Sequence, residues 1–242
     1  MSVDRYYKPG AQVKDYSIIK LLGEGRYGIV YLAYNSYHQK CVIKQLKKNM
    51  LKTTREKLFY EQELLIGLNF PCFPKFIEKF KDHNVEGYVM EYVEGKVFED
   101  LVVREGYEFS KREIYSIAER LLNLINLLQN ANIVHRDIRL PNVIQKKNGE
   151  LVLIDFGLAR YIDYSKYTPQ MDYWYLGDFL IHLYYTSYYI TSRHAKRAWY
   201  QELSLTKYEK TFLKRLLGLS IPYRSIIEIK YDLEHLKANL YF

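Results

Sequence analysis

The stretch HRDIRLPNVI, from His135 to Ile144, raises the central question of this sequence. It places Asp137 and Asn142 five residues apart behind a His-Arg pair. Such a loop could transfer phosphoryl groups, because a carboxylate can receive a hydroxyl proton and an amide oxygen can bind Mg²⁺. It could equally be a chance cluster of polar residues after a helix. The flanking segments decide between these two possibilities.

Composition sets the first limits. The chain has 242 residues, enough for one substantial domain or two small lobes, and its 48% hydrophobic content is ordinary for a soluble globular protein. The formal charge of +8 is spread along the chain and is densest at residues 193–200, where we expect a solvated basic face. No segment resembles a nucleic-acid-binding module.

Targeting signals and membrane segments are not expected. The first ten residues, MSVDRYYKPG, lack the apolar core of a secretory signal. The apolar stretch over 173–190 is interrupted by Asp178 and His182, which favours a helix buried within the protein over a transmembrane helix. Two cysteines, Cys41 and Cys72, give no disulfide framework and favour a cytoplasmic location.

The first part of the chain is rich in predicted strands. Apolar and β-branched runs predict strands over 16–25, 28–35, 40–46, 74–80 and 87–93, with a turn at 81–87. A helix is predicted over 54–69, where Thr53 and Glu56 have the spacing of a capping box.

After Gly95 the pattern becomes mainly helical. A capping box at Ser110 and Glu113 precedes an amphipathic helix, and two short strands flank a turn at Asn148-Gly149. The fold class is therefore α+β, with an antiparallel-sheet lobe over 1–94, a mainly helical lobe over 95–242 and a hinge near 92–96. Two further capping boxes begin the closing helices: Thr206 with Glu209, and Ser225 with Glu228.

The segment GEGRYGIV, over 23–30, has the form G-x-G-x-x-G-x-V. A dinucleotide-binding fold would begin a helix after the third glycine, whereas the residues after Gly28 predict another strand. The glycines therefore cap a hairpin whose backbone N–H groups can approach phosphates.

Lys44 ends an otherwise apolar strand, where an ammonium facing a cleft would attract phosphate oxygens and need a carboxylate partner. Glu61 and Glu63 both lie on the following predicted helix, but they point about 200° apart. Leu58 and Leu65 share the face of Glu61, which makes Glu61 the predicted partner.

A second acidic motif, DFG, begins at Asp155 and ends the second strand of the Asn148-Gly149 hairpin. Asp137, Asn142 and Asp155 thus occupy two loops that flank one short hairpin, which brings them together. The amide oxygen and one carboxylate can hold Mg²⁺, and the other carboxylate can receive a proton.

Over roughly residues 15–180 these motifs resemble, in order and spacing, those of the eukaryotic-type (Hanks-type) serine/threonine protein kinases. The resemblance implies that both lobes form one protein kinase domain that binds ATP with Mg²⁺, or alternatively Mn²⁺. It implies that Asp137 is the base, that Asn142 and Asp155 hold the metal, and that Lys44 contacts the α- and β-phosphates while paired with Glu61. It also places the phosphates under Gly23, Glu24, Gly25 and Gly28.

The same resemblance identifies residues 135–142 as the catalytic loop. It implies a structural role for Asp172, which would hold the backbone of that loop, and it implies an adenine site. The hinge would supply backbone hydrogen bonds to adenine, and Met90 would guard the back of the pocket. The residues implied for this site are Val30, Val42, Met90, Glu91, Val93 and Ile144.

Three departures from the family pattern matter. Arg139 stands where serine/threonine members usually carry Lys, although its guanidinium could still neutralise the transferring phosphoryl group. Val42 replaces the usual Ala and should tighten the adenine pocket. Asp172 follows Asp155 by only seventeen residues, about half the usual interval, and the Ala-Pro-Glu motif is absent, so Arg224 lacks the partner that motif supplies.

The expected function is transfer of the γ-phosphoryl group of ATP to Ser or Thr hydroxyls of a protein substrate. The short segment after Asp155 also suits a small-molecule kinase acting on a sugar or aminoglycoside. A catalytically inactive nucleotide-binding scaffold is a third possibility, but it predicts the loss of a catalytic residue and all are present. The sequence leaves the oligomeric state open.

Overall fold

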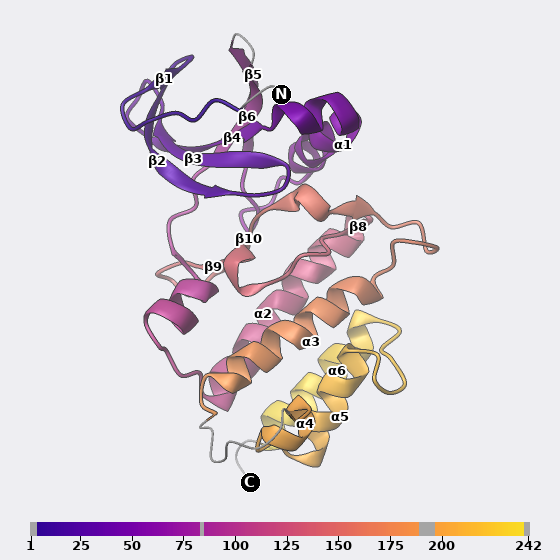
Figure 1. Cartoon of the computed structure of the whole chain (residues 1–242). Coiled ribbons are helices and arrows are strands. Elements are labelled where there is room, and N and C mark those ends of the chain that lie inside the picture. The colour runs from indigo at the N-terminus through magenta and orange to yellow at the C-terminus, as the bar shows by residue number, and fades with distance from the viewer. Residues whose placement is uncertain (1–3, 83–84, 189–196, 240–242) are drawn as a thin grey trace. The chain divides into compact units, whose positions relative to one another are not determined.

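The computed structural model describes residues 4–82, 85–188 and 197–239. The chain divides into two compact units, Met1–Glu94 and Gly95–Phe242, which correspond in Figure 1 to the strand-rich and helix-rich parts. We describe each unit by itself.

Unit 1 contains, in its described residues, a six-stranded antiparallel sheet in the order β1-β2-β3-β4-β6-β5. All five predicted strands are present. The turn predicted over 81–87 is shorter than expected, because both flanking strands extend into it and leave only residues 83–84, which lie outside the described residues. The strands are β1 (Gln12–Val13), β2 (Tyr16–Glu24), β3 (Gly28–Tyr34), β4 (Lys40–Leu46), β5 (Phe76–Asp82) and β6 (Val85–Glu91).

One face of this sheet forms the core of unit 1. Ile29, Tyr31, Ile43 and Val89 are fully buried and belong to one apolar cluster. Because side chains alternate along a strand, the residues between them point to the opposite face. That opposite face carries the candidate site residues described below.

The helix of unit 1, α1 (Lys48–Gly67), begins six residues before the predicted start. Thr53 lies inside it, so the predicted capping box at Thr53 and Glu56 is wrong. Lys47 occupies the N-cap position without a side-chain hydrogen bond, and the N–H of Lys48 donates instead to Oδ1 of Asp4 at 2.8 Å. The cap is therefore a tertiary contact from the N-terminal segment.

Unit 2 contains two small sheets and a group of helices. The strands β7 (Lys96–Val97), β9 (Val143–Gln145) and β10 (Leu151–Leu153) form one sheet, and β8 (Ile133–Val134) pairs with β11 (Arg160–Tyr161). The β9–β10 hairpin predicted around Asn148-Gly149 is confirmed, with Gly149 at φ +84°. The helices are η1 (Asp100–Arg104), α2 (Lys111–Asn130), η2 (Leu140–Asn142), η3 (Phe156–Leu158), α3 (Gln170–Tyr185), α4 (Trp199–Glu202), α5 (Lys207–Leu216) and α6 (Ile226–Ala238).

Helix α3 is central to unit 2, because it packs against α2 on one side and α5 on the other (Figure 1). Nine of its sixteen residues are buried, as expected for the apolar stretch that begins at residue 173. Gly177 allows the close approach of α5, since a Cβ there would lie 3.0 Å from Cβ of Leu216. Among the described helices, none is both long and apolar enough to cross a membrane.

The capping boxes of unit 2 are confirmed at Ser110–Glu113 and Thr206–Glu209. The box predicted at Ser225–Glu228 is only half formed. The hydroxyl of Ser225 accepts from the N–H of Glu228, but the carboxylate of Glu228 accepts from Nη2 of Arg215 at 3.1 Å. Cys41 is buried and Cys72 is partly buried, and the first half of the basic stretch over 193–200, residues 193–196, lies outside the described residues.

Candidate active site

The buried lysine of unit 1 forms the ion pair predicted for it. Nζ of Lys44 lies 2.7 Å from Oε2 of Glu61, and the two side chains are 8% and 6% exposed. Glu63 is exposed, as the helix geometry predicted. A buried ammonium held by a carboxylate has a fixed position, which suits it to bind an anionic group.

The glycine-rich segment of unit 1 forms a hairpin between β2 and β3, as predicted. The N–H of Gly25 donates to the carbonyl of Gly28 at 2.9 Å. Gly28 is required for packing, because a Cβ there would lie 2.7 Å from the carbonyl oxygen of Gln45. Glu24, at the end of β2, forms an ion pair with Lys47 and accepts a hydrogen bond from the hydroxyl of Tyr6 at 2.8 Å.

Four predicted nucleotide-binding residues share one face of the sheet of unit 1. Val30 is paired with Lys44 across β3 and β4, and Val42 is paired with Met90 across β4 and β6. Directly paired residues point to the same face, and so do residues two apart on one strand. Val30 and Met90 remain partly exposed, so this face is not closed by the core of the unit.

The predicted hinge residues follow this face. The N–H of Glu91 donates to the carbonyl of Lys75 at 2.9 Å, so any backbone contact of Glu91 with a nucleotide would use its carbonyl. Val93 lies in the loop after β6 and is partly buried. In unit 2, Ile144 is buried on β9, where it is paired with Val97 and Val152.

The catalytic-loop residues of unit 2 are brought together by hydrogen bonds. Nδ2 of Asn142 donates to Oδ2 of Asp137 at 2.8 Å and to its carbonyl at 2.9 Å. Arg139 binds both carboxylate oxygens of Asp137, with Nη2 at 3.0 Å from Oδ2. This bidentate contact raises the pKa of the Arg139 guanidinium. The sequence did not predict it, because no helix or strand periodicity relates residues two apart in a loop.

Asp155 is held near Asn142 by the backbone. The N–H of Ile154 donates to the carbonyl of Asn142 at 2.9 Å, one rung beyond the β9–β10 hairpin. Asp155 adopts a left-handed conformation with φ +63°, and its carboxylate accepts from the N–H of Gly157. Such a conformation is uncommon for a residue other than glycine and occurs often at functional sites.

Asn142 and Asp155 fit the binding of a divalent cation. Both hydrogen bonds from the side-chain nitrogen of Asn142 go to Asp137, which leaves its amide oxygen as the atom that would bind a metal. The described residues contain no group of three or more His, Cys, Asp or Glu side chains that could hold a metal ion. Mg²⁺ suits such a site, because it commonly binds one or two protein oxygens and takes its other ligands from phosphate and water.

Asp172 holds the catalytic loop, as predicted. Its two carboxylate oxygens accept from the N–H groups of His135 and Arg136, each at 2.8 Å, and the residue is fully buried. Burial raises the pKa of Asp172 to about 6, against the opposing effect of these hydrogen bonds. Arg136 has φ +66°, so the two hydrogen bonds stabilise an otherwise unfavourable backbone conformation.

Two contacts of this loop were not predicted from the sequence. The His135 ring packs edge-on against Phe156 with 4.7 Å between ring centroids, and burial lowers the pKa of His135 to about 4. The guanidinium of Arg136 lies 4.7 Å from the Tyr167 ring centroid and donates to the carbonyl of Leu158 at 3.0 Å. Both are tertiary contacts between segments that a local sequence pattern does not connect.

The fold and this arrangement of residues define a protein kinase. The family model "Protein kinase domain" matches residues 16–194, which is well over half of the chain, and the chain belongs to this family.

Three similar proteins are also named as protein kinases. The chain is 36% identical over 239 residues to "Probable serine/threonine-protein kinase YbdM" of Bacillus subtilis, covering 95% of this chain and 93% of that protein. It is 32% identical over 161 residues to "Calcium-dependent protein kinase 4" of Plasmodium falciparum, covering 63% of this chain but only 30% of that longer protein. It is 32% identical over 148 residues to "Mitogen-activated protein kinase kinase kinase 3" of Arabidopsis thaliana, covering 59% of this chain and 24% of that protein.

Proposed function

We propose that this protein kinase transfers the γ-phosphoryl group of ATP to Ser or Thr hydroxyls of a protein, with Mg²⁺ or alternatively Mn²⁺ as the metal. The observation that carries the proposal is the hydrogen bond between the side chains of Asp137 and Asn142. Asp155 belongs to the same group, because the preceding residue, Ile154, donates its N–H to the carbonyl of Asn142. This group supplies a base and two hard oxygen ligands, which is what phosphoryl transfer to a hydroxyl requires.

Each residue of the group has a distinct proposed role. Asp137 accepts the hydroxyl proton of the acceptor, and its orientation is fixed by Asn142 and Arg139. Asn142 and Asp155 hold the metal ion, which when bound neutralises charge on the phosphates. Arg139 lies beside the base, where its positive charge can stabilise negative charge that develops on the transferring group.

Unit 1 supplies the proposed nucleotide-binding residues. Lys44, fixed by Glu61, contacts the α- and β-phosphates, and the hairpin from Gly23 to Gly28 presents backbone N–H groups to the phosphates. The apolar side chains of Val30, Val42 and Met90 on the same sheet face contact adenine, together with Ile144 of unit 2 and the backbone of Glu91 and Val93.

A protein acceptor is favoured over a small molecule. All three relatives reported above are named as protein kinases. The Bacillus subtilis relative, which matches nearly the whole chain, is named as a serine/threonine-protein kinase. A cytoplasmic location is part of this proposal, because a sequence with two cysteines provides no disulfide framework, which suits a reducing compartment. No feature of the described residues suggests a nucleic-acid partner.

We also propose that activity does not require phosphorylation of the segment after Asp155. In many kinases a phosphate orders this segment by pairing with arginine. Here the Tyr167 ring and the carbonyl of Leu158 contact Arg136, and Oδ1 of Asp163 accepts three backbone N–H groups from residues 165–167. Treatment with a phosphatase should therefore leave the turnover number unchanged; loss of turnover would contradict this proposal.

The main test compares wild type with Asp137→Asn. We expect wild type to transfer labelled phosphate to a panel of generic proteins and peptides in the presence of Mg²⁺, but not to sugars or aminoglycosides. Removal of the base should lower kcat by about 10²- to 10⁴-fold while ATP still binds. An Asp137→Asn variant as active as wild type would exclude Asp137 from the chemistry, and transfer to small alcohols alone would favour a small-molecule kinase.

A further inference from the structure

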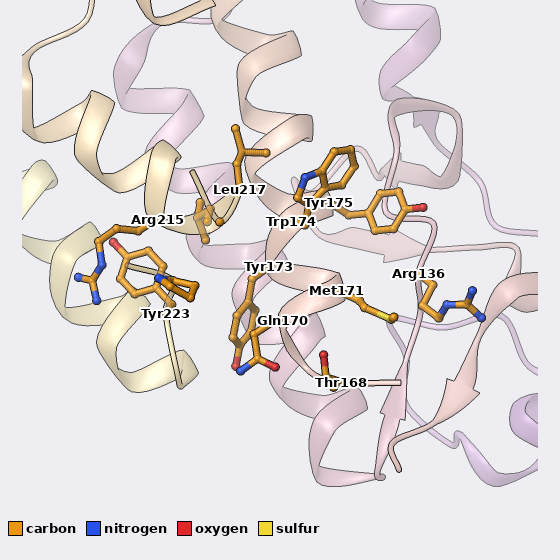
Figure 2. A pocket seen from close by; sticks show the side chains of 13 residues that line it. Arg136, Thr168, Gln170, Met171, Tyr173, Trp174, Tyr175, Arg215, Leu217 and Tyr223 are labelled. Atoms are coloured by element: carbon orange, nitrogen blue, oxygen red, sulfur yellow. The ribbon is translucent and has the colours of Figure 1, made fainter. Parts of the chain in front are cut away.

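Unit 2 contains a pocket of about 450 Å³ at the N-terminal half of α3 (Figure 2). Met171, Trp174 and Tyr175 of α3 form one part of its lining, and Leu217 and Pro222, which follow α5, form another. This volume lies within the range of pockets that bind organic ligands. The lining is mainly aromatic and aliphatic, which favours an apolar occupant.

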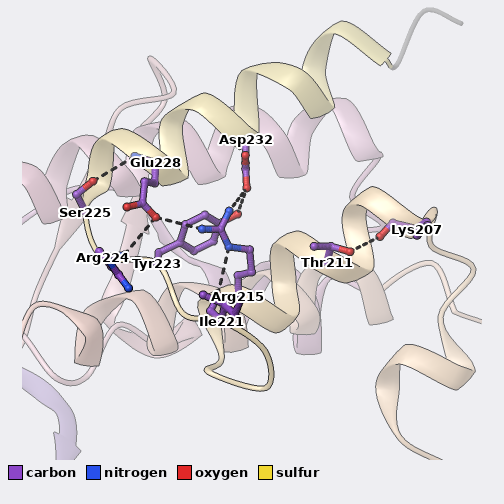
Figure 3. A network of polar contacts seen from close by, with 9 residues as sticks. All are labelled: Lys207, Thr211, Arg215, Ile221, Tyr223, Arg224, Ser225, Glu228 and Asp232. Carbon is purple, nitrogen blue, oxygen red and sulfur yellow. Dashed lines mark hydrogen bonds and ion pairs between the residues drawn. The ribbon is translucent and has the colours of Figure 1, made fainter.

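Two arginines also line this pocket, but Arg215 is already neutralised (Figure 3). Its Nη1 lies 2.7 Å from Oδ2 of Asp232, and its Nη2 lies 3.1 Å from Oε2 of Glu228. Its guanidinium also lies 3.9 Å from the Tyr223 ring centroid. An anionic ligand would have to compete with two carboxylates for this group, so the pocket does not favour a phosphate or an acidic side chain at this end.

The other arginine, Arg136, connects the pocket to the catalytic loop. Its side chain is engaged by Leu158 and Tyr167, as described above, and its neighbour along the chain is Asp137. Tyr175 also connects the two sites, because it lines the pocket while its pKa is raised by burial and by the negative charge of Asp137. The pocket and the catalytic loop therefore share Arg136, the residue that precedes the proposed base Asp137.

The shortened segment leaves this surface open. Residues 156–169 connect Asp155 to α3, and among them Thr168 lines the pocket. Trp174 is 44% exposed although it is large and apolar. An exposed tryptophan in a concave, mainly apolar site commonly marks a place where a partner residue is bound.

We propose that this pocket binds a large apolar side chain of the polypeptide acceptor, at a fixed number of residues from the hydroxyl that receives the phosphoryl group. Trp174 and Leu217 then determine which acceptors are selected. The inference rests on the proposed function, and it adds a specificity site that is formed by α3 and the residues between α5 and α6.

The first test is phosphorylation of a peptide library with a central Ser and one fixed neighbouring residue in each sub-library. We expect wild type to select Phe, Leu, Trp or Met at one position, by about tenfold or more over Ala. Trp174→Ala should lose this selection, whereas Tyr231→Ala, which removes an exposed aromatic side chain of α6 outside the pocket, should keep it. A Trp174→Ala variant with the selection of wild type would overturn the proposal, as would a wild type that selects no apolar residue. If Trp174→Ala does not fold, as judged by its thermal unfolding, Leu217→Glu replaces it in the same comparison.

A second test measures binding without turnover. The chain has two tryptophans, so Trp199→Phe leaves Trp174 as the single fluorescent reporter in the pocket. Its emission should change saturably on titration with a Ser peptide that carries Phe at the selected position. If the library shows no phosphate transfer, peptides with Phe at each position in turn are titrated instead. Matched Ala peptides should have no effect up to about 1 mM, a concentration that corresponds to about 4 kcal/mol of binding.

The outcomes separate this proposal from the proposed function. Saturable binding without phosphate transfer would support the pocket and contradict the kinase activity, whereas transfer without any emission change would do the reverse. Equal changes with Phe and Ala peptides would overturn apolar selection. An emission change that depends on protein concentration in the absence of peptide would instead assign the pocket to contact with a second copy of the chain.

Discussion

The substitution Glu61→Gln tests the ion pair of unit 1. Glutamine keeps the approximate shape of the side chain but removes the negative charge that lies 2.7 Å from the ammonium of Lys44. The helix and the strand that carry the two residues need not change. The experiment therefore isolates the charge of the pair from the packing of α1 on the sheet.

The expected magnitude follows from the burial of the pair. Both side chains are less than 10% exposed, and removing one partner of such a pair typically costs about 3–5 kcal/mol because the remaining charge stays desolvated. For a chain of this size, each kcal/mol corresponds to about 2–4 °C in Tm. We therefore expect Glu61→Gln to lower the Tm by about 6–20 °C.

Thermal unfolding with and without Mg²⁺-ATP separates stability from nucleotide binding. A ligand that binds the folded state raises the Tm by an amount that depends on the ratio of its concentration to Kd. Because Glu61 fixes the proposed phosphate-binding ammonium, the ATP-induced rise in Tm should also become smaller in Glu61→Gln.

Glu63→Gln is the matched control, because Glu63 lies two residues away on α1 and is exposed. Substitution at an exposed position usually changes stability by less than about 0.5 kcal/mol. Glu63→Gln should therefore resemble wild type in both measurements. If Glu61→Gln and Glu63→Gln have the same Tm and the same response to ATP, the buried ion pair contributes neither stability nor binding, and the argument fails.

Two further predictions concern unit 2. Arg139→Ala should lower kcat by about hundredfold through loss of the positive charge beside Asp137. Arg139→Lys keeps a positive charge and should retain most of the activity. Equal kcat values for the two variants in steady-state kinetics would contradict this role of the charge. His135→Phe should alter the pH dependence of stability. Burial lowers the pKa of His135 from 6.5 to about 4, so its contribution to stability is complete above pH 6.5 and is lost as the pH falls to about 4. Relative to wild type, the free energy of unfolding of His135→Phe should therefore rise by about 3 kcal/mol from pH 7 to pH 4, and urea unfolding curves that keep a constant difference would contradict the assignment.

The sequence predicted which candidate site residues come together, because each pattern on which that prediction rests is local. The spacing of Asp137 and Asn142, the hairpin before Asp155 and the choice of Glu61 over Glu63 depend only on turn chemistry and helix geometry. Local rules of this kind do not depend on contacts with residues that are distant in the sequence. The strands of unit 1 were predicted for the same reason, since alternation and β-branched residues indicate them directly.

The errors share an opposite cause, because each involves a long-range contact that replaces a local one. The start of α1 was placed too late because Asp4, distant in sequence, accepts from the N–H of Lys48 at the true start. The box at Ser225 is incomplete because Arg215 of α5 binds the carboxylate of Glu228. A window of a few residues contains no information about either partner.

The shortened segment illustrates how both kinds of contact act together. The backbone of the catalytic loop is held by Asp172, which belongs to α3 and not to the segment, so shortening the segment does not remove that support. The segment also contacts the loop directly, from Phe156 to His135 and from both Leu158 and Tyr167 to Arg136. In the N-terminal half of α3, which follows the short segment, the large side chain of Trp174 remains exposed. A shorter segment should therefore alter which acceptors bind more than it alters the transfer of the phosphoryl group.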